Sequence, residues 1–147
     1  MKLDKQLIRP VCFGLGDGMV SLLGAVWFLS GHPTLVLGAA ISGGVTSAVS
    51  MAGFDSLSDS DRSVRESCTL GLATGVGCAL PAVPYAVLHG AAAVAVSVVI
   101  CAALAVLIAL IRSNRSRALS LAEVLGVVAL AFAAVIICGL FLPGGAA

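Results

Sequence analysis

One acidic residue, Asp17, lies inside an otherwise apolar stretch of the chain that begins at Val11. It follows Val11 by six residues, which corresponds to a depth of about 9 Å at the rise of an α-helix. A carboxylate at that depth in a membrane is costly unless it is paired, hydrated or protonated. We therefore expect Asp17 to bind a cation or a proton. The alternative interpretation is a protonated structural residue that bonds to a neighbouring helix.

The small residues around Asp17 share one face of a helix. With successive residues about 100° apart, one arc holds Gly14, Asp17, Gly18, Ser21, Gly24 and Ala25. The opposite arc holds Leu15, Met19, Leu22, Leu23 and Val26. Small residues let another helix approach closely in a membrane. We predict that the small face meets protein and that the bulky face meets lipid.

A second helix face with small and polar residues is predicted in the next apolar segment, which leads into the polar stretch 55–67. Spacings of three and four residues align Gly44, Ser47, Met51, Asp55 and Ser58. If this helix returns across the membrane, Met51 reaches a depth similar to that of Asp17. A carboxylate oxygen and a thioether sulfur together suit Fe²⁺ or Mn²⁺, whereas Mg²⁺ and Ca²⁺ prefer oxygen ligands alone. A methionine that only fills a packing gap is the alternative.

The polar stretch 55–67 is predicted to be a loop on one side of the membrane. Its carboxylates are Asp55, Asp59, Asp61 and Glu66. They would attract cations to the mouth of a pathway, and helix capping on a solvated loop explains them equally well. The predicted metal site comprises Asp17, Met51 and Asp55, with Ser21, Ser47 and Asp59 as further candidates.

Membrane-spanning helices must position these residues, because the composition excludes a water-soluble domain or enzyme. Of the 147 residues, 60% are hydrophobic and 10% are charged, whereas a soluble domain has about 25% charged residues. The mean hydropathy is +1.15. A spanning helix needs about 20 apolar residues, and the segments that qualify are 11–30, 34–54, 68–88, 91–111 and 121–142. We predict one all-α membrane domain over residues 1–147.

The basic residues predict the orientation of these five spans. All eight fall on one side of the arrangement: Lys2, Lys5, Arg9, Arg62, Arg65, Arg112, Arg115 and Arg117. The positive-inside rule makes that side the cytoplasm, so the N-terminus is expected inside and the C-terminus outside. The first span is expected to be retained, because it is too long for a signal peptide and contains Asp17. The small size suggests a bacterial plasma membrane.

Two prolines, Pro81 and Pro84, are expected to break the third span. A break inside a membrane is tolerated where neighbouring groups or a cavity satisfy the freed carbonyl groups. It would either line a pathway or simply kink the helix.

Three of these segments resemble motifs of the vacuolar iron transporter family. The segment from Gly14 to Val20, GLGDGMV, is similar to the family pattern Gly-x-x-Asp-Gly-Leu of the first helix. The segment 50–58, SMAGFDSLS, resembles Ser-Met-Ala-x-Gly-Glu-Tyr-Leu-Ser, and the segment 80–85, LPAVPY, resembles Pro-x-x-Pro-Tyr. The motifs occur in the family order, and five helices with an internal N-terminus and an external C-terminus also match.

The resemblance implies a dimeric transporter that carries Fe²⁺, and often Mn²⁺, out of the cytosol in exchange for protons. It also implies a translocation site that combines Asp17 and Met51 across the dimer interface, with Asp55 in the place of the family glutamate. Eukaryotic members have a long, Glu-rich cytoplasmic domain between the second and third helices. Here that connection has about a dozen residues.

We therefore expect a homodimeric transporter in the lipid bilayer, with Fe²⁺ or Mn²⁺ and protons as its substrates. No tightly bound cofactor and no nucleic-acid partner are expected. Protonation of Asp17 from an acidic exterior would release the metal ion. The alternative is a non-transporting membrane scaffold or accessory subunit, in which Asp17 binds a partner helix.

Overall fold

The computed structural model describes residues 5–58, 61, 63–111 and 117–141. In these ranges the regular elements are α1 (Lys5–Leu29), α2 (Pro33–Ser58), α3 (Val64–Ala82), the short 3₁₀ helix η1 (Val83–Ala86), α4 (Gly90–Ile111) and α5 (Arg117–Phe141). Five helical segments of 22 to 26 residues are long and apolar enough to cross a bilayer, and α3 and η1 together form the third. The predicted all-α fold with five transmembrane helices is confirmed, and the protein is a multi-pass membrane protein.

The helices α1, α2 and α3 extend further into polar sequence than the predicted spans. α1 begins at Lys5 rather than at 11, α2 ends at Ser58 rather than at 54, and α3 begins at Val64 rather than at 68. Hydropathy marks only the apolar core of a span, whereas the helix continues into the polar interface. The predicted loop over 55–67 is too long at both ends, because Asp55 lies in the last turn of α2 and Glu66 in the first turn of α3.

The ends of these helices follow ordinary capping rules. The side chain of Ser63 accepts a hydrogen bond of 3.3 Å from the Glu66 amide, which caps α3. Pro33 begins α2. Proline is suited to this position, because N–H groups in the first turn of a helix have no acceptor within the helix. The short α1–α2 turn makes these two helices antiparallel neighbours.

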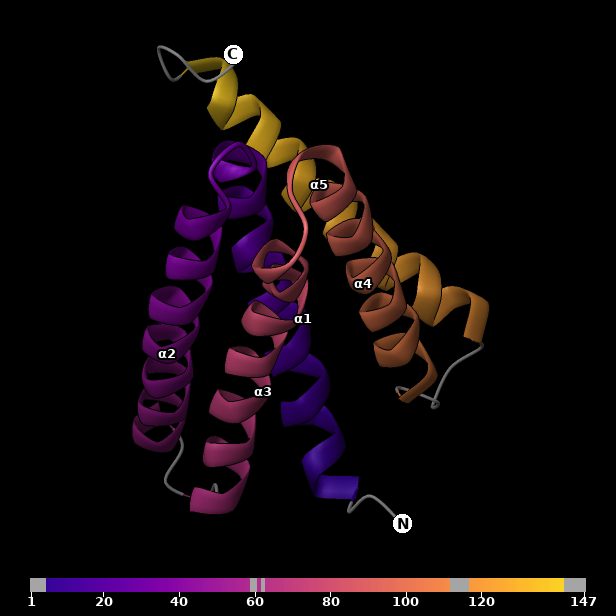
Figure 1. Cartoon of the computed structure of the whole chain (residues 1–147). Helices are drawn as coiled ribbons and strands as arrows, with labels where there is room; N and C mark the ends of the chain where they lie inside the picture. The colour runs from indigo at the N-terminus through magenta and orange to yellow at the C-terminus, as the bar shows by residue number, and fades with distance from the viewer. Residues whose placement is uncertain (1–4, 59–60, 62, 112–116, 142–147) are drawn as a thin grey trace.

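The helix α3 lies against both α1 and α2, and these three helices form the most closely packed part of the bundle (Figure 1). α4 contacts η1, α3 and α1, and α5 packs against α4 and α1. The most apolar part of α5 has none of its residues buried within the chain. α1 begins and α5 ends at opposite ends of the bundle, as five crossings require (Figure 1).

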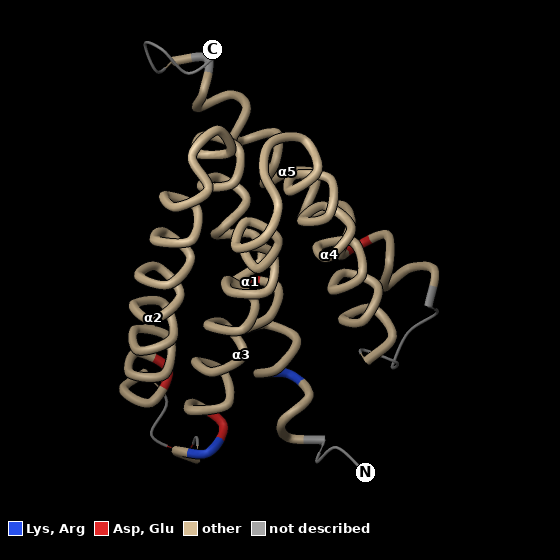
Figure 2. Tube along the Cα trace, in the orientation of Figure 1, with Lys and Arg blue, Asp and Glu red and all other residues tan. Residues whose placement is uncertain are grey.

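Basic residues lie at the end of the bundle where α1 begins (Figure 2). Arg9 is in the second turn of α1 and Arg65 is in the first turn of α3, and both are exposed. We call this the charged end. The opposite end, which carries the α1–α2 turn and η1, is called the hairpin end.

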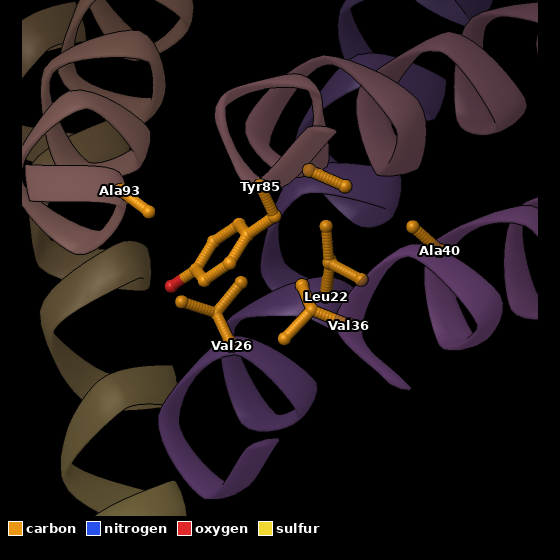
Figure 3. Packing of buried hydrophobic residues seen from close by; sticks show 7 residues of the cluster. Leu22, Val26, Val36, Ala40, Tyr85 and Ala93 are labelled. Carbon is orange, nitrogen blue, oxygen red and sulfur yellow. The ribbon is translucent and has the colours of Figure 1, made fainter. Parts of the chain in front are cut away.

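An apolar cluster closes the bundle toward the hairpin end (Figure 3). Its buried members are Leu22, Val26, Val36, Ala40, Ala82, Tyr85 and Ala93. They come from α1, α2, α3, η1 and α4, so the cluster joins the α1–α2 hairpin to the rest of the bundle. Tyr85 is its largest side chain and is 1% exposed.

The predicted break of the third span is confirmed. α3 ends at Ala82, where the backbone tightens into the 3₁₀ turn η1. In an α-helix the carbonyl of Leu80 would accept a hydrogen bond from the N–H group of residue 84, but Pro84 has none. The Val83 amide donates to this carbonyl in its place. The Ser97 hydroxyl of α4 donates to the Pro81 carbonyl at 2.6 Å. A neighbouring helix therefore satisfies a carbonyl group beside the break.

Candidate functional site

Two glycines, Gly14 and Gly18, bring the backbone of α1 into direct contact with α3. A Cβ atom on Gly18 would collide with the Thr74 carbonyl oxygen and lie 2.8 Å from the Cys78 amide nitrogen. A Cβ atom on Gly14 would lie 2.5 Å from the Leu70 carbonyl oxygen. The Cys78 thiol donates to the Gly18 carbonyl at 3.2 Å. The predicted role of small residues in close helix packing is therefore confirmed for these two glycines.

α2 packs against α3 in the same manner, on an adjoining face. A Cβ atom on Gly71 would collide with the Ala48 carbonyl oxygen and lie 2.9 Å from the Ala52 Cβ atom. Nearer the hairpin end, a Cβ atom on Gly44 would lie 3.2 Å from the Cys78 Cβ atom. Cys78 therefore borders both contacts, the one with α1 and the one with α2.

Asp17 lies at the edge of the α1–α3 contact. It directly precedes Gly18, so its side chain projects about 100° around the helix from the contact. The residue is half-buried, and its carboxylate is close enough to Cys78 to interact with it electrostatically. Because Cys78 also contacts Gly44 of α2, Asp17 projects on the side of α1 that turns toward α2.

Met51 and Ser47 occupy the corresponding edge of α2. Met51 directly precedes the contact residue Ala52, and Ser47 directly precedes Ala48, just as Asp17 precedes Gly18. The side chains of Met51 and Ser47 are both half-buried. α1 and α2 are antiparallel and rest on adjoining faces of α3, so the residues that precede the contacts project toward each other. The structure brings Asp17, Ser47 and Met51 to one side of the α1–α2–α3 unit, which we call the Asp17 side.

Asp55 joins α2 to α3 at the charged end. Its carboxylate Oδ2 accepts a hydrogen bond of 2.8 Å from the hydroxyl of Ser67, which is 2% exposed. Asp55 itself is half-buried. The residue is therefore part of the helix contact and not a freely solvated loop acid.

The three main candidate ligands lie at successive levels along α3. Asp55 contacts Ser67 directly, whereas Ala52 and Gly18, the residues that follow Met51 and Asp17, contact α3 at Gly71 and Thr74, respectively. The steps of four and three residues correspond to about 6 Å and 4.5 Å along the helix. The sequence predicted similar depths for Met51 and Asp17, and the residues that follow them contact α3 within about one helical turn of each other. The series runs from the charged end into the middle of the bundle.

The prediction that the bulky face of α1 meets lipid is wrong. Four of its five members have exposed fractions of 1 to 8%: Leu15, Met19, Leu22 and Val26. α4 covers this face, and Met19 packs with Cys101 and Leu104 there. A helical wheel separates small from bulky residues. It cannot tell which set meets protein, because both are compatible with lipid.

The structure describes one more candidate ligand, Ser21, and one more of the carboxylates of the polar stretch, Asp61. Ser21 is exposed, one turn from Asp17 toward the hairpin end. Asp61 is exposed in the turn between α2 and α3. Asp59 lies outside the described residues.

Sequence analysis missed the contribution of α3 to this region. Its polar and small residues follow spacings of four, three and four, in the order Ser67, Gly71, Thr74 and Cys78. The three that carry a polar side chain or thiol are 0 to 3% exposed. This spacing is typical of one helix face, and it was a signal that α3 packs against the candidate ligands.

One chain supplies few ligands for an ion. Within the part of the chain that the structure describes, no three His, Cys, Asp or Glu side chains gather at one point. Asp17 and Met51 offer one carboxylate and one thioether. Water or a second copy of the chain would supply the other ligands of an ion held there.

Fold and site together define a five-helix membrane protein with a carboxylate in the middle of its first span. Comparison with protein-family models, with curated proteins and with solved structures finds no match for the chain. The resemblance of three motifs to the vacuolar iron transporter family therefore stays a prediction.

Proposed function

We propose that the protein exports Fe²⁺ or Mn²⁺ from the cytoplasm in exchange for protons. The observation that carries the proposal is the order of contacts along α3: Asp55 contacts Ser67, and the residues that follow Met51 and Asp17 contact Gly71 and Thr74, respectively. Such a series offers an ion successive ligands between the charged end and the middle of the membrane. The motif resemblance to the vacuolar iron transporter family supports the same function.

The chemistry of the Asp17 side suits this cargo. A borderline metal ion accepts both a carboxylate oxygen and a thioether sulfur, and Met51 would disfavour Mg²⁺ and Ca²⁺. A carboxylate binds a metal ion only when it is deprotonated. Metal and proton therefore compete for Asp17, and this competition is the basis of exchange.

A homodimer through the Asp17 side is part of the proposal. Ionisable residues inside membranes normally face protein or a water-filled cavity rather than lipid. Asp17 is half-buried and Ser21 is exposed in the single chain, so a second copy would shield both. The second copy would also bring its own Asp17 and Met51 to the same ion.

We infer the direction of transport from the charged end. Arg9 and Arg65 lie there, and the positive-inside rule assigns that end to the cytoplasm. Asp55 lies at this end of α2 and would meet the ion first. We propose a bacterial plasma membrane as the location, with the outer side acidic enough to protonate Asp17.

Flux into proteoliposomes tests the function. Purified protein is reconstituted with an imposed pH gradient, and uptake of Fe²⁺, Mn²⁺, Mg²⁺ and Ca²⁺ is compared. We expect Fe²⁺ or Mn²⁺ uptake that needs the proton gradient and that Asp17→Asn abolishes. The matched control is Glu123→Gln, which neutralises an acid of α5, away from the Asp17 side, and should retain uptake. Undiminished uptake by Asp17→Asn would refute the assigned role.

A non-transporting scaffold is the second candidate, and the close glycine contacts of α3 with α1 and α2 favour it. Those contacts make a compact unit even without any cargo. Growth distinguishes the two functions. Expression of an exporter confers resistance to excess iron or manganese, and expression of a scaffold confers none.

A further inference from the structure

The carboxylate of Asp55 is held by a buried hydroxyl group. Ser67, near the start of α3, is 2% exposed, and its hydroxyl donates to Oδ2 of Asp55 at 2.8 Å. A hydrogen bond to an ionised carboxylate is stronger than one between neutral groups. Because the donor is enclosed by protein, its position is fixed, and it restricts the orientation of the Asp55 side chain in turn.

The backbone of Asp55 is held as well. Asp55 lies in the last turn of α2, and the hydroxyl of Ser58 donates to its carbonyl oxygen at 3.1 Å. The last four carbonyl groups of a helix have no N–H donor within the helix, so a side chain that bonds one of them stabilises the helix end. Asp55 is therefore held at its backbone by α2 and at its carboxylate by α3.

The helices α2 and α3 meet through other residues. A Cβ atom on Gly71 would collide with the Ala48 carbonyl oxygen, and a Cβ atom on Gly44 would lie 3.2 Å from the Cys78 Cβ atom. Close contacts of this kind join two membrane helices by packing alone. The two helices therefore do not depend on the Ser67 hydrogen bond to meet, and the specific effect of this bond is on the orientation of the carboxylate.

We propose that Ser67 is a positioning residue, which holds the carboxylate of Asp55 in the orientation that receives an ion at the charged end. The inference rests on the proposed transport function, in which Asp55 meets the ion first. Asp55 is half-buried, so it reaches the surface of the bundle while its Oδ2 atom bonds Ser67. Carboxylates that bind metal ions are themselves hydrogen-bonded by neighbouring groups, which orient them and strengthen the binding of the ion.

The kinetics of Mn²⁺ uptake into proteoliposomes test this role. Initial rates are measured over a range of Mn²⁺ concentrations, under the imposed pH gradient. Ser67→Ala should raise KM about tenfold, because loss of a group that orients a metal ligand costs about ten- to hundredfold in affinity or activity. It should leave kcat unchanged, because Asp17 and Met51 are untouched. A role in folding alone would lower the amount of active protein and leave KM unchanged.

A double-mutant cycle shows whether Ser67 acts through Asp55. Asp55→Ala should itself raise KM, and the further rise caused by Ser67→Ala should disappear in this background. The matched control is Thr69→Ala. The Thr69 hydroxyl donates at 2.7 Å to the Arg65 carbonyl within α3, so its removal takes a hydroxyl group from the same part of the helix and should leave KM unchanged.

A second substitution at position 67 decides the matter if Ser67→Ala does not fold. Ser67→Cys keeps nearly the same size and shape but has only a weak thiol donor. Its KM should lie between those of the original chain and the chain without Asp55.

The positioning role is overturned if KM is unchanged in the folded Ser67 variants, or if Ser67→Ala raises KM equally with and without Asp55. An unchanged KM in Asp55→Ala also overturns it, whereas the proposed export function survives that result if Asp17→Asn still abolishes flux. Absence of Mn²⁺ and Fe²⁺ flux in the original chain rejects the export function and the positioning role together.

Discussion

Alanine at position 18 should separate α1 from α3, whereas alanine at position 16 should not. Both positions flank Asp17 in the same helix. A Cβ atom on Gly18 would collide with the Thr74 carbonyl oxygen and lie 2.8 Å from the Cys78 amide nitrogen. A Cβ atom on Gly16 would meet only the Ile108 Cδ1 atom, at 3.8 Å. The pair therefore isolates the close backbone contact.

The magnitude follows from two opposing terms. Replacing a mid-helix glycine by alanine stabilises a helix by about 1 kcal/mol. Overpacking costs about 1–3 kcal/mol, and the upper value applies to Gly18 because backbone atoms of α3 cannot rotate away. Gly18→Ala should therefore lower the free energy of unfolding by about 2 kcal/mol, and Gly16→Ala should raise it by about 1 kcal/mol.

Equilibrium unfolding in mixed detergent micelles, followed by circular dichroism, measures this difference. Gly16→Ala serves as the control for helix propensity. Equal stability of the two variants, or a Gly18→Ala variant more stable than the original chain, would refute the proposed backbone contact between α1 and α3.

Three further substitutions probe the contacts and the cargo. Ser67→Ala removes the hydrogen bond to Asp55 and should lower the free energy of unfolding by about 1–2 kcal/mol, measured by the same titration. Ser97→Ala leaves the Pro81 carbonyl without its donor and should cost about 1–3 kcal/mol. A neutral result in either titration would contradict the corresponding hydrogen bond. Met51→Leu conserves volume, so it should unfold like the original chain while losing the preference for Fe²⁺ over Mg²⁺ in competitive flux. Retained preference would exclude the sulfur as a ligand.

Composition and hydropathy were sufficient to predict the five spans, because so apolar a chain can be solvated only by a lipid bilayer. The ends of the helices were not predictable in this way. Asp55 and Ser58 are polar, yet they continue α2, since a helix keeps its backbone hydrogen bonds in the polar interface as well. Hydropathy therefore predicted a loop at residues that form the last turn of α2.

Helical periodicity predicted which residues share a face, but not what the face meets. It grouped Gly14 with Gly18, which pack on α3, and it grouped Ser47 with Met51 on one edge of α2. It assigned Met19 to lipid, although this residue is 1% exposed. Lipid and protein interiors are equally apolar, so only the path of α4 and α5 decides which face is covered.

The affinity of the purified protein for Mn²⁺, measured as a function of pH, tests the central claim most directly. Proton and metal compete for the Asp17 carboxylate in this account. We predict that the affinity weakens as the pH is lowered, and that Asp17→Asn binds weakly with little dependence on pH, whereas Glu123→Gln binds like the original chain. An Asp17→Asn variant with the original affinity and the original pH dependence would contradict the account.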